Sequence, residues 1–528
     1  MSQRPWLWLL LLCAVNFMFM LGGHTLWDVD EPNNAVCARE MLEVGNWWVP
    51  VFNGGLRFDK PILLYWLMMP AYALFGVNEF SARLPSALSM TALTFVVWYF
   101  ARRMVNARAG LIAAGLFATC LHIIVISRAA TPDPVFMLCL CTAMFALLCF
   151  YLEGMRKSLL LYVAYIAMGF GVLAKGPVAV AMPVLTWGAF LLLMGQWRRV
   201  WQFRPWMGLA IVLAIALPWY ITVGVLTDGL WLKGFLLHHN IDRFTHALQG
   251  HRGFPGFYLV TFFLGWFPWS GLLVASIALG SWRLIALRQD PLRLHLLVWI
   301  GAFFIFFSIA GTRLPNYMLP AFPAAALLMA RWLEDAETLR AERWLLYTAA
   351  VLAVGVLGGG IFALQHQWPG EWVYGLCFLP VALTVLWSMW RRATTLPVIG
   401  GGMMVSVLIL ASWTLPALDQ HKVAKPFAQA ADQAGFSGRE LATYHYFQPS
   451  LLFYHGGRLP LLRSMPKLES WLTDGKAVVM PQEALKSFPP AILPYLVIHR
   501  RAYGLYARKW LILVSLKPLE GLSWKKKS

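Results

Sequence analysis

Apolar runs of about 20 residues recur along most of the chain and alternate with short polar connections. A helix of roughly that length crosses the hydrocarbon core of a bilayer, so each run predicts one membrane-spanning helix. The pattern is typical of an α-helical polytopic membrane protein. The thirteen predicted spans lie near residues 6–23, 80–100, 109–126, 134–152, 158–174, 177–195, 206–226, 256–280, 294–310, 317–333, 344–364, 372–390 and 396–415.

The connection between the first two predicted spans, residues 24–79, contains a shorter apolar stretch. It reads PILLYWLMMPAYALFG, with a proline inside it, and it is shorter than the roughly 20 residues that a span needs. We therefore predict a helix that lies at the membrane surface. The segment Pro32–Val44, which Gly45 follows, predicts a second and more polar helix in this connection.

The pattern changes after about Pro416. The rest of the chain mixes polar and apolar residues, and short strand-like runs such as AVVM, YLVIH and WLILVSL lie between turn residues. The sequence therefore predicts two domains. Residues 1–416 form a transmembrane domain that includes the connection 24–79, and residues 417–528 form a small α/β domain outside the membrane.

Composition and charge agree with the membrane prediction and set the orientation. Of the 528 residues, 59% are hydrophobic and 13% charged, and the formal net charge is +19. The N-terminus and alternate connections carry 17 Lys and Arg in compact clusters, against ten on the opposite side. Because cytoplasmic connections are the more basic ones, we expect a cytoplasmic N-terminus and, with an odd number of spans, an external C-terminus.

Acidic side chains follow the first predicted span. Asp28, Asp30 and Glu31 lie in the first external connection, and Asp133 opens the fourth span in the next one. Both connections thus place a carboxylate at the same predicted membrane depth. Such a group can act as a general base on an acceptor hydroxyl or amine, or it can hold a divalent cation, and the spacing does not separate these roles. A solvated loop is the structural alternative.

Cations and imidazoles are expected on the same side of the membrane. Arg and Lys make charge-assisted hydrogen bonds to phosphate oxygens, so their convergence beside the acids indicates an anionic phosphate substrate. Each also has a structural alternative, such as a lysine that extends from a helix end towards water. The residues are Lys60 in RFDKP, Lys175 in LAKGP, His238, His239 and Arg243 in LLHHNIDRF, and Arg313 in GTRLPNY.

The first external connection, DVDEPNNAVCAREMLEVGNWWVPVFNGGLRFDKPILLYW, resembles that of the bacterial lipid-to-lipid glycosyltransferases related to the aminoarabinose transferase of lipid A, within the protein mannosyltransferase superfamily. The family pattern is Asp-Glu, Arg-Glu-Met, Gly-x-Trp, then Asp/Glu-Lys-Pro and an aromatic pair. The matching residues here are Asp30-Glu31, Arg39-Glu40-Met41, Gly45-Asn46-Trp47, Asp59-Lys60-Pro61 and Tyr65-Trp66. Later segments, including TPDPVF, LAKGPVA, HNIDRF and LPNYMLP, also resemble the family in order, over roughly residues 5–335.

The resemblance implies the GT-C fold, with surface helices in the first periplasmic connection and a cavity open to the outer leaflet. It implies transfer of a sugar from a polyprenyl-phosphate carrier to lipid A, lipopolysaccharide or another envelope acceptor at the periplasmic face of the bacterial inner membrane. The partners are therefore the lipid-linked donor, the acceptor and membrane lipids. No nucleotide cofactor and no nucleic-acid partner are expected.

Carried over position by position, the resemblance implies roles for individual residues. The catalytic acids are Asp30, with Glu31 beside it, and Asp133. The residues that bind phosphate or line the cavity are Lys60, Lys175, Arg243, Arg313 and Tyr317, and a divalent metal is implied at Asp59 with His239. One position departs from the family, since Pro32 follows Asp30-Glu31 where the lipid A enzymes tend to carry a basic residue.

Three alternatives stay open at this point. A flippase for an anionic lipid-linked sugar would use similar groups, although transporters tend to place them near the bilayer midplane and to contain paired repeats. A transferase with a protein acceptor would share the donor chemistry. A lipid-binding scaffold would need neither Asp30 nor Asp133. The transferase reading rests on the convergence of acids and cations in one outward-facing pocket.

Overall fold

The computed structural model describes residues 4–236, 254, 256–278, 283–334, 338–391, 396–504 and 506–517. The chain forms two compact units, and each is built from separate stretches of sequence. Unit 1 consists of Met1–Leu21, Phe58–Ala71 and Arg83–Thr414, and unit 2 of Gly22–Arg57, Tyr72–Ala82 and Leu415–Ser528. Most of the connection that the sequence assigned to the first domain is thus grouped with the C-terminal part of the chain.

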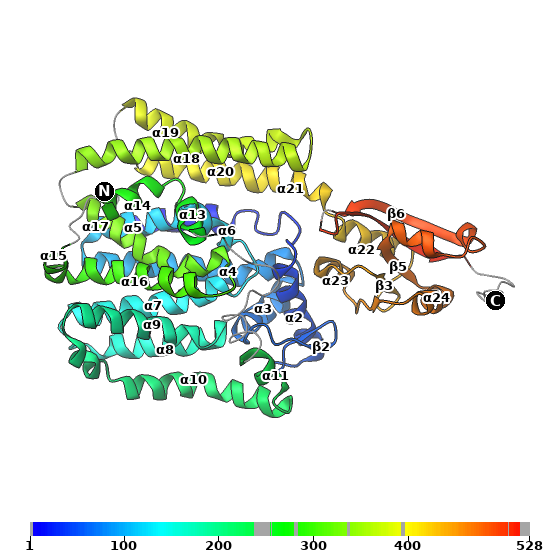
Figure 1. Ribbon diagram of the computed structural model, residues 1–528, viewed down its shortest axis with the longest axis horizontal. Coiled ribbons are helices and arrows are strands. Elements are labelled where there is room, and N and C mark those ends of the chain that lie inside the picture. The colour runs from blue at the N-terminus through cyan, green and yellow to red at the C-terminus, as the bar shows by residue number, and fades with distance from the viewer. Residues whose placement is uncertain are drawn as a thin grey trace. The chain divides into compact units, whose positions relative to one another are not determined.

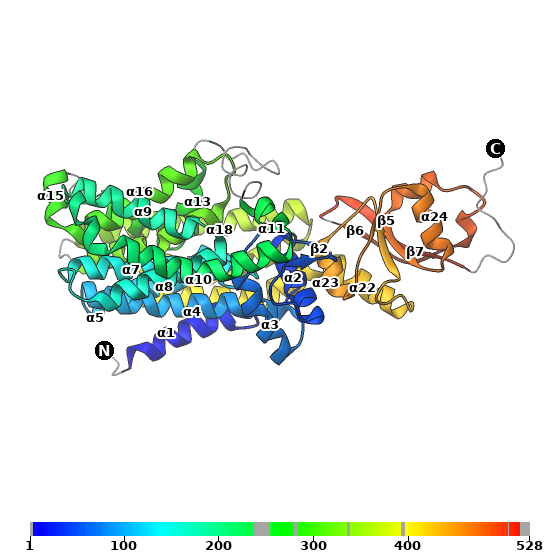
Figure 2. The same cartoon turned by 90° about the horizontal axis from the view of Figure 1, so that it is seen from below.

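Unit 1 is a bundle of long apolar helices that run alongside one another (Figures 1 and 2). Within the described residues, eight helical segments are long and apolar enough to cross a membrane, or ten if two bent pairs each count as one span. The chain is therefore a helical membrane protein, but the predicted number of thirteen spans is not confirmed. The eight segments are α4 (Glu79–Met104), α7 (Asp133–Leu152), α8 (Ser158–Lys175), α10 (Pro205–Leu226), α16 (Pro291–Ile309), the end of α18 (Thr338–Gln367), η6 with α19 (Glu371–Phe378, Leu379–Arg391), and α20 with its continuation (Leu396–Ile409, then to His421).

The other helices of this part of the chain are shorter. The first predicted span is α1 (Pro5–Cys13) with η1 (Ala14–Met18), and the apolar stretch in the first connection is α3 (Leu63–Phe75). The span predicted near 317–333 is a 3-10 helix, η5 (Pro315–Ala321), followed by α17 (Phe322–Glu334). The remaining short helices are α9 (Val178–Leu193), η2 (Trp197–Phe203), α11 (Leu230–Lys233) and α15 (Leu284–Gln289).

Two predicted spans are broken in the middle. Residues 109–126 form α5 (Ala107–Thr119) and α6 (Leu121–Ser127), bent by 66°, and residues 256–280 contain α13 (Phe257–Gly265) and α14 (Ser270–Ala278), bent by 118°. The breaks are joined to each other. The Leu121 N–H donates to the Phe267 carbonyl (2.9 Å), and the Trp269 indole N–H donates to the Thr119 hydroxyl (2.9 Å). Each break thus satisfies polar groups that the other exposes.

Close helix contact in unit 1 depends on small residues. α8 packs against both α7 and α10. A Cβ atom added at Gly208 of α10 would lie 2.5 Å from the Tyr165 ring of α8, so only glycine allows this approach. In the centre, Phe145 of α7 lies between Phe100 and Trp299, with ring centroids 5.8 and 5.2 Å away. Dispersion contacts of this kind hold the bundle together in the absence of a hydrophobic driving force between helices.

Unit 2 combines a helix of the first connection with a mixed sheet. α2 (Asp30–Val44) confirms the second helix predicted there, and Gly45 ends it in the left-handed conformation (φ 68°). The hairpin of β1 (Val51–Phe52) and β2 (Gly55–Leu56) follows. The C-terminal part contains α22 (Ala424–Gln433), α23 (Pro449–His455), α24 (Met465–Thr473) and the strands β3 (Leu441–Tyr444), β4 (Leu461–Leu462), β5 (Ala477–Pro481), β6 (Leu496–Gly504) and β7 (Lys509–Leu516).

The five strands lie in the order β4-β3-β5-β7-β6, with β3 parallel to β4 and β5 and the other pairs antiparallel. Leu468 and Leu472 of α24 pack on the alternating residues Val478, Ile512 and Val514 of the sheet. The strand-like runs found in the sequence are β5, β6 and β7, so this part of the prediction is confirmed. The division at residue 416 stays a prediction.

Candidate active site

The ends of two neighbouring helices of unit 1 bring a carboxylate and an ammonium group together. α7 begins at Asp133 and α8 ends at Lys175. An acid in the first turn and a base in the last turn each stabilise a helix through its dipole. The Lys175 ammonium donates a hydrogen bond to Asp133 Oδ1, and the two side chains are only 16% and 13% exposed. Two groups that the sequence predicted for the site therefore form one protected ion pair.

Other functional groups of unit 1 surround this pair. Lys175 Nζ lies 5.4 Å from the centre of the Tyr317 ring. The side chains of Lys60 and His122 lie close enough to Asp133 to interact with it electrostatically. His122 Nε2 is in turn 3.1 Å from the Asn316 side-chain oxygen. The pair, Lys60, His122 and Tyr317 thus form one polar group among the largely apolar helices of unit 1.

The charges of this group favour an anion. Lys60 and Lys175 contribute two positive charges, and Asp133 contributes one negative charge that Lys175 already binds. The two ammonium groups lie in surroundings of lowered dielectric constant, where ionic interactions are stronger than in bulk water. A phosphate oxygen is a suitable partner for the ammonium groups, because charge-assisted hydrogen bonds to phosphate are among the strongest available to a side chain.

Asp28, Asp30 and Glu31 of the first connection belong to unit 2, and their surroundings differ sharply. Asp28 is bound to the start of α23: its carboxylate accepts hydrogen bonds from the Ser450 backbone N–H (2.9 Å), the Ser450 hydroxyl (2.6 Å) and the Gln448 amide (2.6 Å). Burial raises the pKa of the Asp28 carboxyl, and these hydrogen bonds oppose the rise. Asp28 therefore caps a helix, and its position is structural.

We expect Asp28→Ala to loosen α23, because the substitution leaves the Ser450 N–H without its acceptor. The loss should be about 1–3 kcal/mol of local stability, which corresponds to amide exchange about 5- to 100-fold faster in residues 449–455. Hydrogen exchange read by mass spectrometry on the full chain in detergent measures it. Asp28→Asn keeps one acceptor oxygen and should have a smaller effect; equal protection of α23 in all three proteins would contradict the capping role.

Glu31 and Asp30 are adjacent but have opposite surroundings. Glu31 is only 4% exposed, and its carboxylate accepts a hydrogen bond from the Trp27 backbone N–H (2.8 Å). Asp30, the first residue of α2, is exposed and makes no hydrogen bond or ion pair with any residue that the structure describes. Of Asp28, Asp30 and Glu31, Asp30 is thus the one whose carboxylate is available to a substrate.

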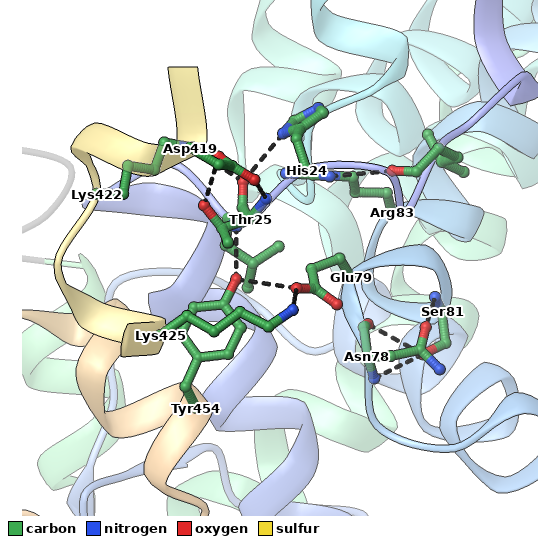
Figure 3. A network of polar contacts seen from close by, with 12 residues as sticks. His24, Thr25, Asn78, Glu79, Ser81, Arg83, Asp419, Lys422, Lys425 and Tyr454 are labelled. Carbon is green, nitrogen blue, oxygen red and sulfur yellow. Dashed lines mark hydrogen bonds and ion pairs between the residues drawn. The ribbon is translucent and has the colours of Figure 1, made fainter. Parts of the chain in front are cut away.

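Polar contacts from the C-terminal part of unit 2 fix the segment that leads into α2 (Figure 3). The Thr25 backbone N–H and hydroxyl donate to the two carboxylate oxygens of Asp419 (2.7 and 2.8 Å). Lys422 donates to the Thr25 carbonyl (3.1 Å), and its ammonium lies 3.6 Å from the centre of the Trp27 ring. These contacts hold the backbone just before the acids.

A second set of contacts lies beside the first in Figure 3. The Glu79 carboxylate accepts hydrogen bonds from Lys425 (2.9 Å) and from the Tyr454 hydroxyl (3.2 Å). Tyr454 also accepts a hydrogen bond from the Leu26 N–H (2.8 Å). The backbone just before Asp30 is therefore held by contacts between residues 394 and 428 positions apart in the sequence.

The Arg-Glu-Met motif has structural contacts. The Arg39 guanidinium donates to the carbonyls of Leu452 and Phe453 at the end of α23 (3.3 and 3.0 Å). The Glu40 carboxylate accepts from the backbone N–H groups of Asn53 and Gly54 (2.9 and 3.1 Å) and so holds the β1–β2 turn. These residues position α2 and its hairpin.

The structure describes only some of the remaining predicted site residues. Arg313 is half-buried, and its guanidinium donates to the carbonyls of Phe254 and Ser308 (3.0 and 3.2 Å). Arg243 and His239 lie outside the described residues. Within the described part of the chain, no three His, Cys, Asp or Glu side chains come together as a metal site would require. The metal at Asp59 and His239 and the convergence of Asp30 with Asp133 therefore stay predictions.

Sequence reasoning missed His122 and Asn316. His122 is one imidazole in an apolar run, and nothing in its neighbourhood marks the helix break that places it beside Asp133. Asn316 lies in the LPNY segment, whose prolines account equally well for a helix start. Only the three-dimensional fold brings these two residues to the Asp133 and Lys175 pair.

Comparison with known proteins gives the family. A family model described as dolichyl-phosphate-mannose-protein mannosyltransferase matches residues 59–221. The undecaprenyl phosphate-alpha-4-amino-4-deoxy-L-arabinose arabinosyl transferase of Serratia proteamaculans is 32% identical over 69% of this chain and 68% of its own length. The chain belongs to this arabinosyl transferase family. The relatives from Pectobacterium carotovorum and Edwardsiella ictaluri are also 32% identical, over 66% and 59% of their lengths, so the match spans a little less than two thirds of these proteins.

A solved structure shows the family's fold. The crystal structure of ArnT from Cupriavidus metallidurans bound to undecaprenyl phosphate superimposes on this chain with a TM-score of 0.81 and 22% sequence identity, over 99% of this chain and 100% of that one. Its apo form gives a TM-score of 0.80. The likeness confirms the GT-C fold that the sequence resemblance implied. The family assignment confirms that resemblance itself.

Proposed function

We propose that this protein transfers 4-amino-4-deoxy-L-arabinose from undecaprenyl phosphate to lipid A or a closely related envelope acceptor. The observation that carries the proposal is the 32% identity to arabinosyl transferases across 69% of the chain. The polar group around Asp133 and Lys175 supports it, because ammonium groups suit the phosphate of a lipid-linked sugar. The proposed sugar is a pentose, as the names of the relatives state.

The proposed reaction is a displacement at the anomeric carbon. The acceptor oxygen forms a bond to that carbon while the bond from the carbon to the phosphate oxygen breaks, and undecaprenyl phosphate leaves with the electron pair. Asp30 accepts the proton of the acceptor O–H group, a role for which its exposed carboxylate is suited. Lys60 and Lys175 stabilise the negative charge that grows on the leaving phosphate, and Asp133 positions Lys175.

Lys60→Gln should weaken binding of the carrier and slow transfer by about 10²- to 10³-fold, because the substitution removes a cation that stabilises charge in the transition state. Steady-state kinetics with varied lipid-linked donor measure the change. Lys157→Gln is the matched control, since this exposed lysine pairs with Glu153 elsewhere in unit 1. A rate within twofold of wild type for Lys60→Gln would remove Lys60 from the phosphate site.

We also propose that the protein lies in the bacterial inner membrane with a cytoplasmic N-terminus and a periplasmic C-terminus. The bias of Lys and Arg between alternate connections supports this orientation. Reporter fusions at the two ends of the full chain test the orientation.

We propose Asp59 and His239 as the ligands of a divalent metal ion. Transfer activity measured before and after chelation of divalent metals tests this proposal.

The decisive experiment uses the purified full chain in detergent with undecaprenyl phosphate-linked aminoarabinose and lipid A. Mass spectrometry should detect lipid A that carries the added pentose. Detergent removes the sealed bilayer, so product formation there requires a transferase and cannot come from a flippase. Movement of the donor across a vesicle membrane without covalent product would overturn the proposal. If the sugar is transferred only to a protein, the proposed acceptor is wrong.

A further inference from the structure

An apolar groove lies on unit 1, and none of the residues that line it belongs to the polar group around Asp133. Its volume is about 790 Å³, within the roughly 300–1,000 Å³ of small-molecule sites. α5 forms its floor, and α1 and α20 form its walls, where Trp8, Leu12 and Met404 contribute side chains. Both α1 and α20 pack against α5, so the groove is part of the folded bundle.

The two ends of the groove differ in chemistry. One end carries Arg108, the single charged residue among the described residues that line it, and its side chain is 69% exposed. The other end reaches Thr119 and Trp269, which are already hydrogen-bonded to each other (2.9 Å). The groove therefore offers an apolar surface along its length and a positive charge at one mouth.

The dimensions suit one chain of a lipid. Arg108 and Thr119 lie eleven residues apart on α5, which is about 16 Å along a helix axis. That length is close to half the roughly 30 Å hydrocarbon core of a bilayer, and so to the depth of one leaflet. Arg108 lies at the start of α5, where a phosphate of that leaflet would meet a cation.

We propose that this groove binds one acyl chain of an anionic glycerophospholipid, whose headgroup phosphate pairs with the Arg108 guanidinium. Arg108 also lies 3.5 Å from the Glu334 carboxylate. The Arg108 side chain itself is 69% exposed, so Arg108 remains able to contact a phosphate in the headgroup layer. The site is separate from the proposed transfer chemistry and does not depend on it.

Two glycines allow the groove to be filled without disturbing its walls. A Cβ atom added at Gly115 of α5 or Gly401 of α20 would meet no atom within 4 Å, and both residues line the groove. The double substitution Gly115→Leu with Gly401→Leu therefore places two side chains where the acyl chain would lie. Gly301→Leu is the matched control, because Gly301 of α16 is equally open and does not line the groove.

The test reconstitutes the full chain with phosphatidylglycerol or phosphatidylcholine of identical acyl chains and counts retained lipid by native mass spectrometry. Wild type and Gly301→Leu should retain one phosphatidylglycerol, and the groove-filling variant should retain about tenfold less. In Arg108→Gln, the ratio of retained phosphatidylglycerol to retained phosphatidylcholine should fall about tenfold. Phosphatidylglycerol with a photoreactive acyl chain should label α5 and α20.

Three results would overturn the proposal. One is undiminished retention in the groove-filling variant, another is labelling confined to other helices, and the third is an unchanged lipid preference in Arg108→Gln. Displacement of the labelled phospholipid by undecaprenyl phosphate alone would assign the groove to the carrier chain. If the double variant fails to fold, Arg108→Gln and the labelling pattern still decide, because neither changes the helix packing.

Discussion

Asp30→Asn is expected to lower sugar transfer by about 10²- to 10⁴-fold, the usual contribution of a general base. The amide cannot accept the proton of the acceptor, and the fold should persist because the Asp30 carboxylate makes no hydrogen bond or ion pair with the described residues. Single-turnover transfer, with the purified protein in excess over the donor and with lipid A saturating, measures the loss. Membrane insertion and thermal stability should match wild type.

The control for this experiment is Glu43→Gln on the same helix. Glu43 is exposed and pairs only with Arg39 (3.4 Å) in the described part of the chain, so its substitution should leave transfer nearly unchanged. Asp30→Glu should recover part of the activity, since it retains the carboxylate at a shifted position. Full activity in Asp30→Asn would exclude Asp30 as the base, and equal losses in Asp30→Asn and Glu43→Gln would indicate a general effect on α2.

Removing either partner of the Asp133 and Lys175 pair should destabilise unit 1 strongly. Asp133→Asn or Lys175→Met leaves a largely buried charge without its counterion, at a cost of about 3–5 kcal/mol. The double substitution removes both charges and should recover much of that stability while transfer stays lost. Thermal unfolding of the full chain in detergent, read together with transfer rates, separates the two effects.

The matched control is the exposed pair of Lys509 and Glu483, whose side chains are 51% and 72% exposed and whose disruption should cost at most about 1 kcal/mol. Additive losses in the double variant of Asp133 and Lys175 would show that the two side chains do not depend on each other. Recovery of transfer together with stability would show that the pair has only a structural role.

The sequence predicted the chemical roles of individual residues better than it predicted which residues contact one another. Asp133 and Lys175 were expected on one side of the membrane because both lie at helix ends, and the structure shows that they form a pair. The helix α2 was predicted from Pro32 and Gly45, since start and stop signals are local. The role of Asp28 was not predictable, because its partner Ser450 is 422 residues away and no local pattern connects them.

Helix breaks were also beyond the reach of the sequence. Thr119, Cys120 and Leu121 include no glycine or proline, so a hydropathy window sees one continuous apolar run. At the break, the Leu121 N–H donates to the carbonyl of residue 267, and the indole of residue 269 donates to Thr119. A site residue such as His122, which follows the break directly, becomes recognisable only when that tertiary contact is known.

The joined breaks of α5–α6 and α13–α14 also constrain the order of assembly. During synthesis, residues 107–127 reach the membrane well before Phe267 and Trp269 exist, and an unsatisfied N–H in hydrocarbon costs several kcal/mol. The first half of the chain therefore enters the bilayer with a hydrogen bond still to be made. The arrangement around His122 and Asp133 is completed only when the later hairpin docks, so a truncated chain would carry the site's residues without its geometry.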